Sequence, residues 1–500
     1  MLPSETMIWQ PEFTDKTLSR KPGAVHIAKD SIQQPRETAM DSVSSVERLR
    51  TKAFYQLLVD RLGTEAWAAR KAAYFKRIRE KEAKFNINLP IEPQLFIPAE
   101  DDIDWYILAS YLSHDFPYSD ATYSSRRIYP YAMAIGAVAD QLRKVPYVDD
   151  VLDKMLANNN KPETQIFELL TASFYLKNGY EVAFIPESSI VWPDGKTKKS
   201  PDMLVKLGDL EFYVECKRSD KQTKYSKTEE QAWANIWHQL SQHMLKVAPW
   251  NIVDIIFHEQ VASVTPADVI KAVNLAIKGG TGKANEGSIS VGIRAIDKLG
   301  LRRHYRKFSV RANSPQHELL VFGDLDSNEK RSISTIAQRV IRPGTNNDIL
   351  NIFVEDVAKC VGAQWCCDHE ISLGLRSKHF KSLLNDGVMQ IPPDRAGVVH
   401  IWYETCEGID IEELRRDKNM EHISAYDASK TTVLGAFLHA VNYYPLEDNY
   451  EWAETVQDFA RVPDLMGLFL RQPLMLTSDS TRGVEGVTHW EQDKTAKSMR

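Results

Sequence analysis

Apolar residues between about Ser45 and Lys84 recur at spacings of three to five positions, and Arg and Lys fill much of the remainder. This period is typical of an amphipathic helix, so we expect a helical region here. The segment Leu89–Pro98 contains three prolines, which predict the end of that region and a linker. Residues 1–44 are polar with scattered prolines, and we expect an extended, loosely packed arm.

Residues 101–157 also have a helical pattern and are rich in aromatic side chains. The stretch from about Glu163 to Asn178 predicts another helix. It stops at Gly179, a residue type suited to the left-handed conformation that closes many helices. A short apolar strand, EVAFIP, follows directly.

Two further apolar stretches, 202–207 and 210–217, flank the pair Gly208-Asp209. Two strands separated by such a pair predict a β-hairpin. A long helix from about Lys227 to Lys246 comes next. Beyond Asn251 the pattern weakens and becomes mixed. It predicts strands at 253–259, 288–296, 318–324 and 397–404, and helices at 266–278, 347–360 and 431–445.

The chain has 500 residues, which is too long for one small domain at about 100–200 residues per domain. We expect a polar arm and helical region over 1–100, an α/β core over 101–250, and an α+β half over 251–500. That last half would serve recognition, oligomerisation or regulation. A different division follows if the strand 397–404 joins the sheet of the core, because the stretch between would then be a large insertion.

Composition excludes several classes of protein. Hydrophobic residues make up 43% and charged residues 26%, which is ordinary for a globular chain and excludes a collagen-like or wholly disordered one. The net charge of −6 excludes a histone-like binder, although local basic patches remain compatible with nucleic acid. Five cysteines do not form a disulfide framework. No apolar run is long enough to span a membrane, so we expect a cytoplasmic protein without a membrane partner.

Four residues between positions 163 and 217 carry the candidate chemistry. Asp202 follows Pro201 at the start of one predicted strand, and Glu215 and Lys217 lie near the end of the next. Side chains alternate along a strand, so Glu215 and Lys217 share a face, and the hairpin brings Asp202 near them. Glu168 interrupts the otherwise apolar helix before them.

These residue types suit metal-assisted hydrolysis. Carboxylates on rigid elements are ligands for Mg²⁺ or Mn²⁺, and such an ion would also relieve the repulsion between them. The metal polarises a phosphoryl oxygen and activates water. A neighbouring lysine can orient that water and offset the developing charge.

The arrangement resembles the PD-(D/E)XK nuclease superfamily, which has the restriction-endonuclease-like fold. The matching residues are Pro201-Asp202, Glu215-Cys216-Lys217 and the upstream Glu168, within about 60–80 residues. The resemblance implies an α/β core with a mixed sheet flanked by helices, and Mg²⁺-dependent endonuclease cleavage, usually of DNA. It assigns metal binding to Asp202, Glu215 and Glu168, and handling of the water to Lys217. A restriction or anti-phage defence role is compatible with such a chain.

Other interpretations stay open. Glu215 and Lys217 can be a solvated face of an edge strand, with Asp202 a turn residue and Glu168 a surface residue; Glu163 is a rival for the helical position. The function can be non-catalytic, as a nucleic-acid-binding or scaffold protein on a degenerate nuclease fold, or cleavage of RNA instead of DNA. Each of these functions is compatible with a homo-oligomer or with binding to a partner protein.

Basic residues near the candidate site can contact nucleic-acid phosphates. In the loops around the site these are Lys198, Lys199, Arg218 and Lys221. A second patch combines Arg302, Arg303 and Arg306 with aromatic residues, which suits phosphate contact and base stacking. A solvated lysine-rich loop, and an exposed strand edge, would have the same composition.

Overall fold

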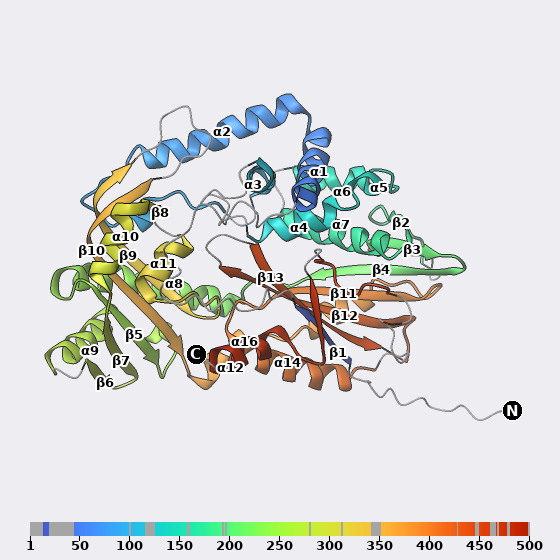
Figure 1. Cartoon of the computed structure of the whole chain (residues 1–500). Coiled ribbons are helices and arrows are strands. Elements are labelled where there is room, and N and C mark those ends of the chain that lie inside the picture. The colour runs from blue at the N-terminus through green and yellow to red at the C-terminus, as the bar shows by residue number, and fades with distance from the viewer. Residues whose placement is uncertain are drawn as a thin grey trace.

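A computed structural model describes the chain as an α/β protein in which mixed sheets are flanked by helices (Figure 1). The residues it describes are 14–19, 45–99, 102–115, 126–157, 161–192, 195, 198–279, 282–311, 314–341, 352–427, 429–445, 450–460, 467, 470–477 and 481–498.

The larger sheet has eight strands in the order β14-β1-β13-β12-β11-β4-β3-β2. In chain order its strands are β1 (Thr14–Ser19), β2 (Glu181–Phe184), β3 (Met203–Leu207), β4 (Leu210–Arg218), β11 (Gly397–Glu404), β12 (Val433–Pro445), β13 (Tyr450–Ala460) and β14 (Arg482–Glu485). β11 lies parallel to both β4 and β12, and the remaining neighbours are antiparallel.

The smaller sheet has the order β6-β7-β5-β10-β8, and β9 also pairs with β10. Its strands are β5 (Asn251–Phe257), β6 (Lys283–Glu286), β7 (Ile289–Ala295), β8 (Val310–Arg311), β9 (Lys330–Ile341) and β10 (Phe353–Cys367). All of them lie in the sequence between β4 and β11. The smaller sheet is therefore built from a large insertion into the larger one.

Helices cover the two faces of the larger sheet (Figure 1). One face packs against helices that precede β2: α1 (Ser45–Leu62), α3 (Ile103–Asp115), α4 (Ile128–Gly136), α6 (Val148–Leu156) and α7 (Pro162–Lys177). The other face packs against α13 (Lys381–Val388), α14 (Ile409–Ser424) and α16 (His489–Ser498). Side chains alternate between the two faces along each strand. In β4, Phe212 and Val214 pack against the helices that precede β2, and Tyr213 packs against the layer of α13, α14 and α16.

Helices also flank the smaller sheet. One of its faces packs against α8 (Lys224–Val247) and α9 (Pro266–Lys278). The opposite face packs against α10 (Lys298–Phe308) and α11 (Pro315–Phe322). The other helical segments are α2 (Thr64–Glu82), η3 (Glu92–Gln94), α5 (Ala139–Leu142), η5 (Val261–Ser263) and α12 (Glu370–Arg376). In Figure 1, α2 extends from α1 toward the smaller sheet.

The predicted linker at Leu89–Pro98 is instead bound to the smaller sheet. Ile91 is fully buried there, and its backbone N–H donates to the carbonyl of Thr335 at 2.9 Å. The arm expected over 1–44 lies largely outside the described residues, but β1 within it pairs with β13 and β14. The prolines in these two segments did not indicate that either segment binds a sheet, because such pairing depends on strands that are distant in the sequence.

The larger sheet contains strands from both sides of the boundary predicted at residue 250. Val399 of β11 lies beside Glu215 of β4, and Ile401 lies beside Lys217. The boundary between a core at 101–250 and a half at 251–500 is therefore wrong as a division of the sheet. The alternative, in which 397–404 returns to it, is the arrangement observed.

Three predicted elements beyond residue 251 are of the wrong type. The expected strand 318–324 falls in α11, which Ser314 caps and Gly323 ends with φ of 89°. The expected helices 347–360 and 431–445 overlap β10 and β12, whose described residues are strand. Strands buried on both faces have continuous apolar runs that periodicity cannot distinguish from a buried helix. The helix expected at 266–278 and the strand at 397–404 are confirmed.

Candidate functional site

The β3–β4 hairpin holds Asp202 against the strand that carries Glu215. Gly208 adopts φ of 60° in the two-residue turn, a conformation that glycine takes without strain. Met203 then pairs with Val214, and continuing this register by one residue sets Asp202 opposite Glu215. The Oδ2 atom of Asp202 accepts a hydrogen bond from the backbone N–H of Cys216 at 2.7 Å. The predicted proximity of Asp202 to this strand is confirmed.

Glu215 is completely buried and pairs with Lys217 two positions along the same strand face. The Lys217 ammonium donates to Oε1 of Glu215. The Oε2 atom is also buried and accepts no hydrogen bond from any described residue. A buried carboxylate oxygen without a donor is costly, so Glu215 retains an unused ligand position. The solvated edge strand considered as the alternative is not what the structure has at Glu215.

Glu168 lies on α7, which packs against β4 from the other face of the sheet. Burial raises the pKa of Glu168 well above its ordinary value, and the negative charges of Asp202 and Glu215 raise this pKa further. The structure thus brings the three predicted carboxylates into one electrostatic neighbourhood. Glu163, the rival on the same helix, is engaged elsewhere: it accepts from the Tyr106 hydroxyl at 2.5 Å and pairs with Arg127 and Arg218.

Burial dominates the ionisation of the carboxylates in the hairpin. It raises the pKa of Glu215 to about 8, assisted by the charge of Asp202 and opposed by Lys217. The pKa of Asp202 is also raised by burial, although its bond from Cys216 and the charge of Lys217 act in the opposite direction. Closely placed carboxylates with raised pKa values mark a site where a bound cation would be stabilising.

Two lysines outside the motif also act on this cluster. Lys199 is exposed just before Asp202, and its charge lowers the pKa of all three carboxylates. Lys154, on α6, lowers the pKa of Glu168 and Asp202. Sequence reasoning named Lys199 but missed Lys154. Nothing in the α6 sequence marks Lys154 as functional, because only the packing of α6 on α7 brings it here.

Asp202 and Glu215 are the two residues at this site that could hold a metal ion. Among the residues described, no group of three His, Cys, Asp or Glu side chains is arranged to hold a metal ion. Mg²⁺ is commonly held through one or two carboxylates, with waters and substrate phosphate completing its shell. Asp202 and the unpaired oxygen of Glu215 supply such a pair. Glu168 is placed to act on them through its charge.

The predicted basic contacts have different environments. Lys198 lies over the Trp192 ring, 4.1 Å from its centroid, and Lys221 is partly exposed. Arg218 is mostly buried, and it pairs with Glu163 and lies 3.8 Å from Glu404. Arg218 therefore belongs to a buried cluster in which it and Arg127 share the carboxylates of Glu163 and Glu404. A direct phosphate contact by Arg218 is not what the structure favours.

The second basic patch lies on α10, not on a strand edge. Arg302 pairs with Asp356 at 2.9 Å and Arg306 pairs with it at 2.8 Å. These bonds, with that from Arg302 the largest, lower the pKa of Asp356 to about 2. Arg303 is exposed on the same helix. Part of this patch is thus neutralised within the fold.

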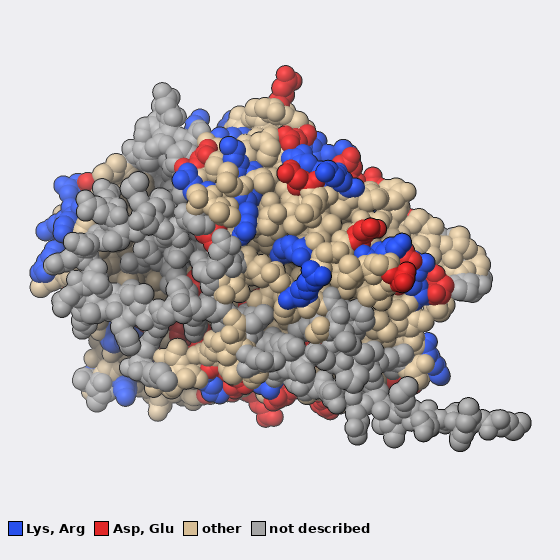
Figure 2. Space-filling model, turned by 45° about the vertical axis from the view of Figure 1, so that its right-hand side comes forward, with Lys and Arg blue, Asp and Glu red and all other residues tan. Residues whose placement is uncertain are grey.

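Figure 2 shows one face of the molecule with its charges. Lys and Arg side chains on it occur in separate groups, some of them beside Asp and Glu, without a continuous basic stripe over the described surface of this face. This mixture agrees with the net charge of −6. Electrostatic attraction for a polyanion on this face would therefore be local.

No helix in the described parts of the chain has the length and apolar character needed to cross a bilayer. Comparison of the chain with models of protein families, with curated proteins and with solved structures found no match.

Proposed function

We propose that this protein is a metal-dependent nuclease that hydrolyses phosphodiester bonds, with DNA as the expected substrate and Mg²⁺ or Mn²⁺ as the cofactor. The observation that carries the proposal is the hairpin geometry. The Asp202 carboxylate is fixed 2.7 Å from the Cys216 amide, beside the buried Glu215 and its partner Lys217. Hydrophobic packing alone would not place these three charged groups together.

The chain order around the site supports the same proposal. Helix α7 precedes an antiparallel β2-β3-β4 meander, and β11 pairs in parallel with β4. The site therefore lies in a mixed sheet flanked by helices, which is the coarse arrangement that the resemblance implies. The resemblance itself still depends on Pro201-Asp202 and Glu215-Cys216-Lys217.

Each residue has a role that follows from its environment. Asp202 and Glu215 would hold the cation, and Glu168 would add negative charge that favours its binding. When bound, the metal would supply Lewis-acid polarisation of the phosphate. Lys217 is held by Glu215 at the position from which an ammonium can orient water and offset charge on the phosphate oxygens. Lys199, exposed beside Asp202, is available for a backbone phosphate of the substrate.

A non-catalytic nucleic-acid-binding protein is the second candidate. The observation that favours it is the Lys217–Glu215 ion pair, because this bond occupies the oxygen that a second metal contact would need. An RNA nuclease would use the same residues, and the substrate tested distinguishes it.

The experiment compares cleavage of plasmid DNA and of RNA by the full chain, with Mg²⁺, with Mn²⁺ and with EDTA. We expect metal-dependent cleavage that falls by about two to three orders of magnitude in Asp202→Asn and in Lys217→Ala. The matched control is Asp209→Asn, an exposed turn residue of the same hairpin, which should keep full activity. Binding without cleavage, equal in all variants, would establish the non-catalytic candidate instead.

A further inference from the structure

Three polar residues meet at one end of the smaller sheet, whereas the candidate metal site belongs to the larger one. His258 directly follows β5, Asp368 directly follows β10, and Ser290 is the second residue of β7. The parallel strands β5 and β10 end together, which sets His258 and Asp368 side by side. The antiparallel neighbour β7 brings Ser290 to the same face. Three positions that are far apart in the sequence thus converge.

The three side chains form a continuous chain of hydrogen bonds. The Nδ1 atom of His258 lies 2.9 Å from Oδ2 of Asp368 and 3.0 Å from Oδ1. The Nε2 atom of His258 lies 2.7 Å from Oγ of Ser290. Because a carboxylate only accepts hydrogen bonds, Nδ1 of the neutral ring carries the hydrogen and donates to Asp368. Nε2 therefore accepts the hydrogen bond of the Ser290 hydroxyl.

This order of groups is the one that makes a serine hydroxyl nucleophilic. A base within hydrogen-bond reach takes the hydroxyl proton as the oxygen attacks, and a third group orients the base. Here His258 is the base, and Asp368 holds its ring with Nε2 toward Ser290. The nearby Ser288 has a different partner, because its hydroxyl donates to the Glu259 carboxylate, which is a weaker base than imidazole.

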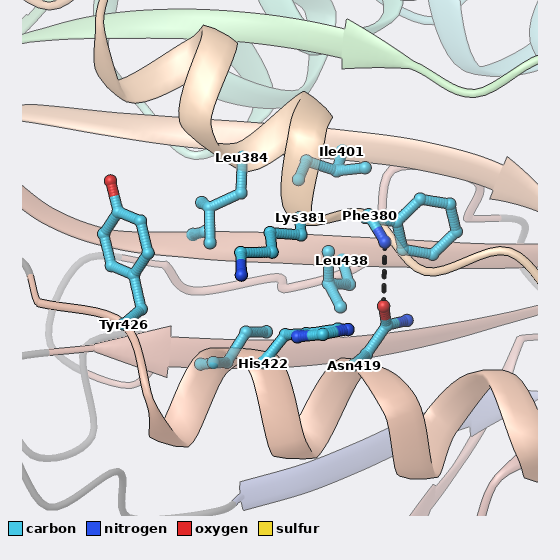
Figure 3. A pocket seen from close by; sticks show the side chains of 10 residues that line it. Phe380, Lys381, Leu384, Ile401, Asn419, His422, Tyr426 and Leu438 are labelled. Atoms are coloured by element: carbon cyan, nitrogen blue, oxygen red, sulfur yellow. Dashed lines mark hydrogen bonds between the residues drawn. The ribbon is translucent and has the colours of Figure 1, made fainter.

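The triad of Ser290, His258 and Asp368 is open to a reactant from solvent. The side chains of His258 and Asp368 are 40% and 54% exposed, and Ser290 is partly exposed. Ile256 pairs with Ser290 in the β5–β7 register and is also exposed, so an apolar group could lie beside the hydroxyl. The hollow in Figure 3 is a separate feature: α13 and α14 wall it over the larger sheet, and neither His258 nor Ser290 lines it.

We propose that this triad is a second reactive centre, which takes an acyl group from an activated carboxylic ester. The Ser290 Oγ atom bonds to the ester carbonyl carbon while its proton passes to Nε2 of His258. The bond from that carbon to the leaving oxygen then breaks, and the leaving oxygen takes the proton from Nε2. The products are an acylated Ser290 and a free alcohol. Water, activated by His258 in the same way, then hydrolyses the acyl-serine.

The open setting restricts the class of ester. A surface holds a small molecule less firmly than a cleft does. The His258 amide donates to the Ser288 carbonyl at 2.8 Å, so by alternation Ile256 and Ser290 are the next bonded pair of the ladder. The Ser290 amide is thus engaged in the sheet and does not stabilise an oxyanion. The substrate must therefore supply a good leaving group, such as a phenolate, and general-base catalysis would accelerate its reaction by about 10²–10⁴-fold.

The proposal does not rest on the nuclease activity, and its test uses the full chain in EDTA so that the candidate metal site takes no part. The probe is para-nitrophenyl acetate. Release of para-nitrophenolate is followed by absorbance, and acetylated residues are located by mass spectrometry of acid-quenched samples. We expect Ser290 to be acetylated about a hundredfold faster than Ser288.

Ser290→Ala is the decisive variant, because it removes the nucleophile and keeps His258, whose imidazole can itself react with an aryl ester. We expect release of para-nitrophenolate to fall by about tenfold or more. Ser288→Ala removes a hydroxyl two positions earlier and is the matched control, which should react normally. Unchanged release in a folded Ser290→Ala protein, or acetylation of Ser290 no faster than that of Ser288, would overturn the proposal. The three residues would then only link the strand ends.

The roles of the other two residues have separate readouts. His258→Ala should prevent acetylation of Ser290, and free imidazole should restore part of it, because the site is exposed and a solute can replace a base. Asp368 is a positioning residue that acts through His258. Asp368→Asn should slow acetylation, since an amide can donate to Nδ1 and so turn Nε2 into a donor. Asp368→Glu, which keeps a carboxylate, should restore part of the rate. Failure of imidazole to restore any acetylation would contradict the role of His258 as the base.

Discussion

At the scale of single residues, the candidate site depends on a carboxylate that folding makes difficult to ionise. Glu215 is removed from water and lies beside Asp202, so its pKa rises to about 8 from an ordinary value of 4.5. The unfolded chain releases this proton at lower pH than the folded protein. Stability should therefore fall as pH increases between these two values.

We expect Glu215→Gln to remove that pH dependence. We compare the free energies of unfolding of the variant and of the unmodified chain without metal. The difference between them, variant minus unmodified, should increase by on the order of a few kcal/mol from about pH 5 to about pH 8. Urea unfolding at the two pH values, in EDTA, measures the difference. Parallel pH profiles for the two proteins would mean that Glu215 ionises normally.

Mg²⁺ should oppose the loss of stability at high pH, because it binds the ionised carboxylates. We expect the increase in Tm on adding Mg²⁺ to be larger at about pH 8 than at about pH 5. The increase should be absent in Glu215→Gln and retained in Asp209→Asn. A Tm increase of equal size in all three proteins would place the metal elsewhere.

At the scale of elements, close packing of helices fixes the layer beneath the site. A Cβ atom on Gly136 of α4 would lie 1.8 Å from the carbonyl oxygen of Arg50 on α1. Because that oxygen belongs to the backbone, the two helices can accept a side chain only by moving apart. This contact belongs to the core shared with α7, which positions Glu168.

We expect Gly136→Ala to lower the free energy of unfolding by about 1–3 kcal/mol or more. Its matched control is Gly374→Ala on α12, where a Cβ atom would meet nothing within 4 Å. Because alanine favours a helix more than glycine does, Gly374→Ala should raise the free energy of unfolding by about 0.5–1 kcal/mol. Urea unfolding of both variants tests the pair, and similar effects of the two substitutions would contradict the close approach of α1 and α4.

At the scale of the whole molecule, the insertion between β4 and β11 joins the two sheets. A buried ionic cluster connects them: Lys330 of β9 lies 3.4 Å from Glu229 of α8 and 3.6 Å from Glu407, and Arg376 lies 3.1 Å from Glu407. Buried charges of this kind depend on each other, since loss of one partner leaves the others unpaired. The two sheets should therefore unfold together.

A chain cut after residue 250 should consequently not fold on its own. It keeps Asp202, Glu215 and Lys217 but lacks β11, whose eight residues are all buried, so the edge of β4 would be exposed. We expect no cooperative urea transition and no metal-dependent cleavage from residues 1–250, whereas we expect both from the full chain. A cooperative transition in the fragment would show that residues 1–250 fold independently, as the domain boundary predicted at residue 250 implies.

The sequence by itself determined the local features near the site. Strand alternation placed Glu215 and Lys217 on one face, the Gly208-Asp209 turn predicted the hairpin, and Pro201-Asp202 indicated the strand start. These features depend on neighbours only a few residues apart. The helix at 266–278 was predictable for the same reason, because Thr265 caps it and its apolar face has a regular period.

Only the tertiary structure decided which distant segments meet. The pairing of β4 with β11, and the contribution of Lys154 to the carboxylates, each join positions far apart in the chain. The buried cluster of Arg218 with Arg127, Glu163 and Glu404 does the same. No local period encodes such contacts, since they arise from the shared burial of whole layers. For that reason the motif was visible in the sequence, but its charge environment was not.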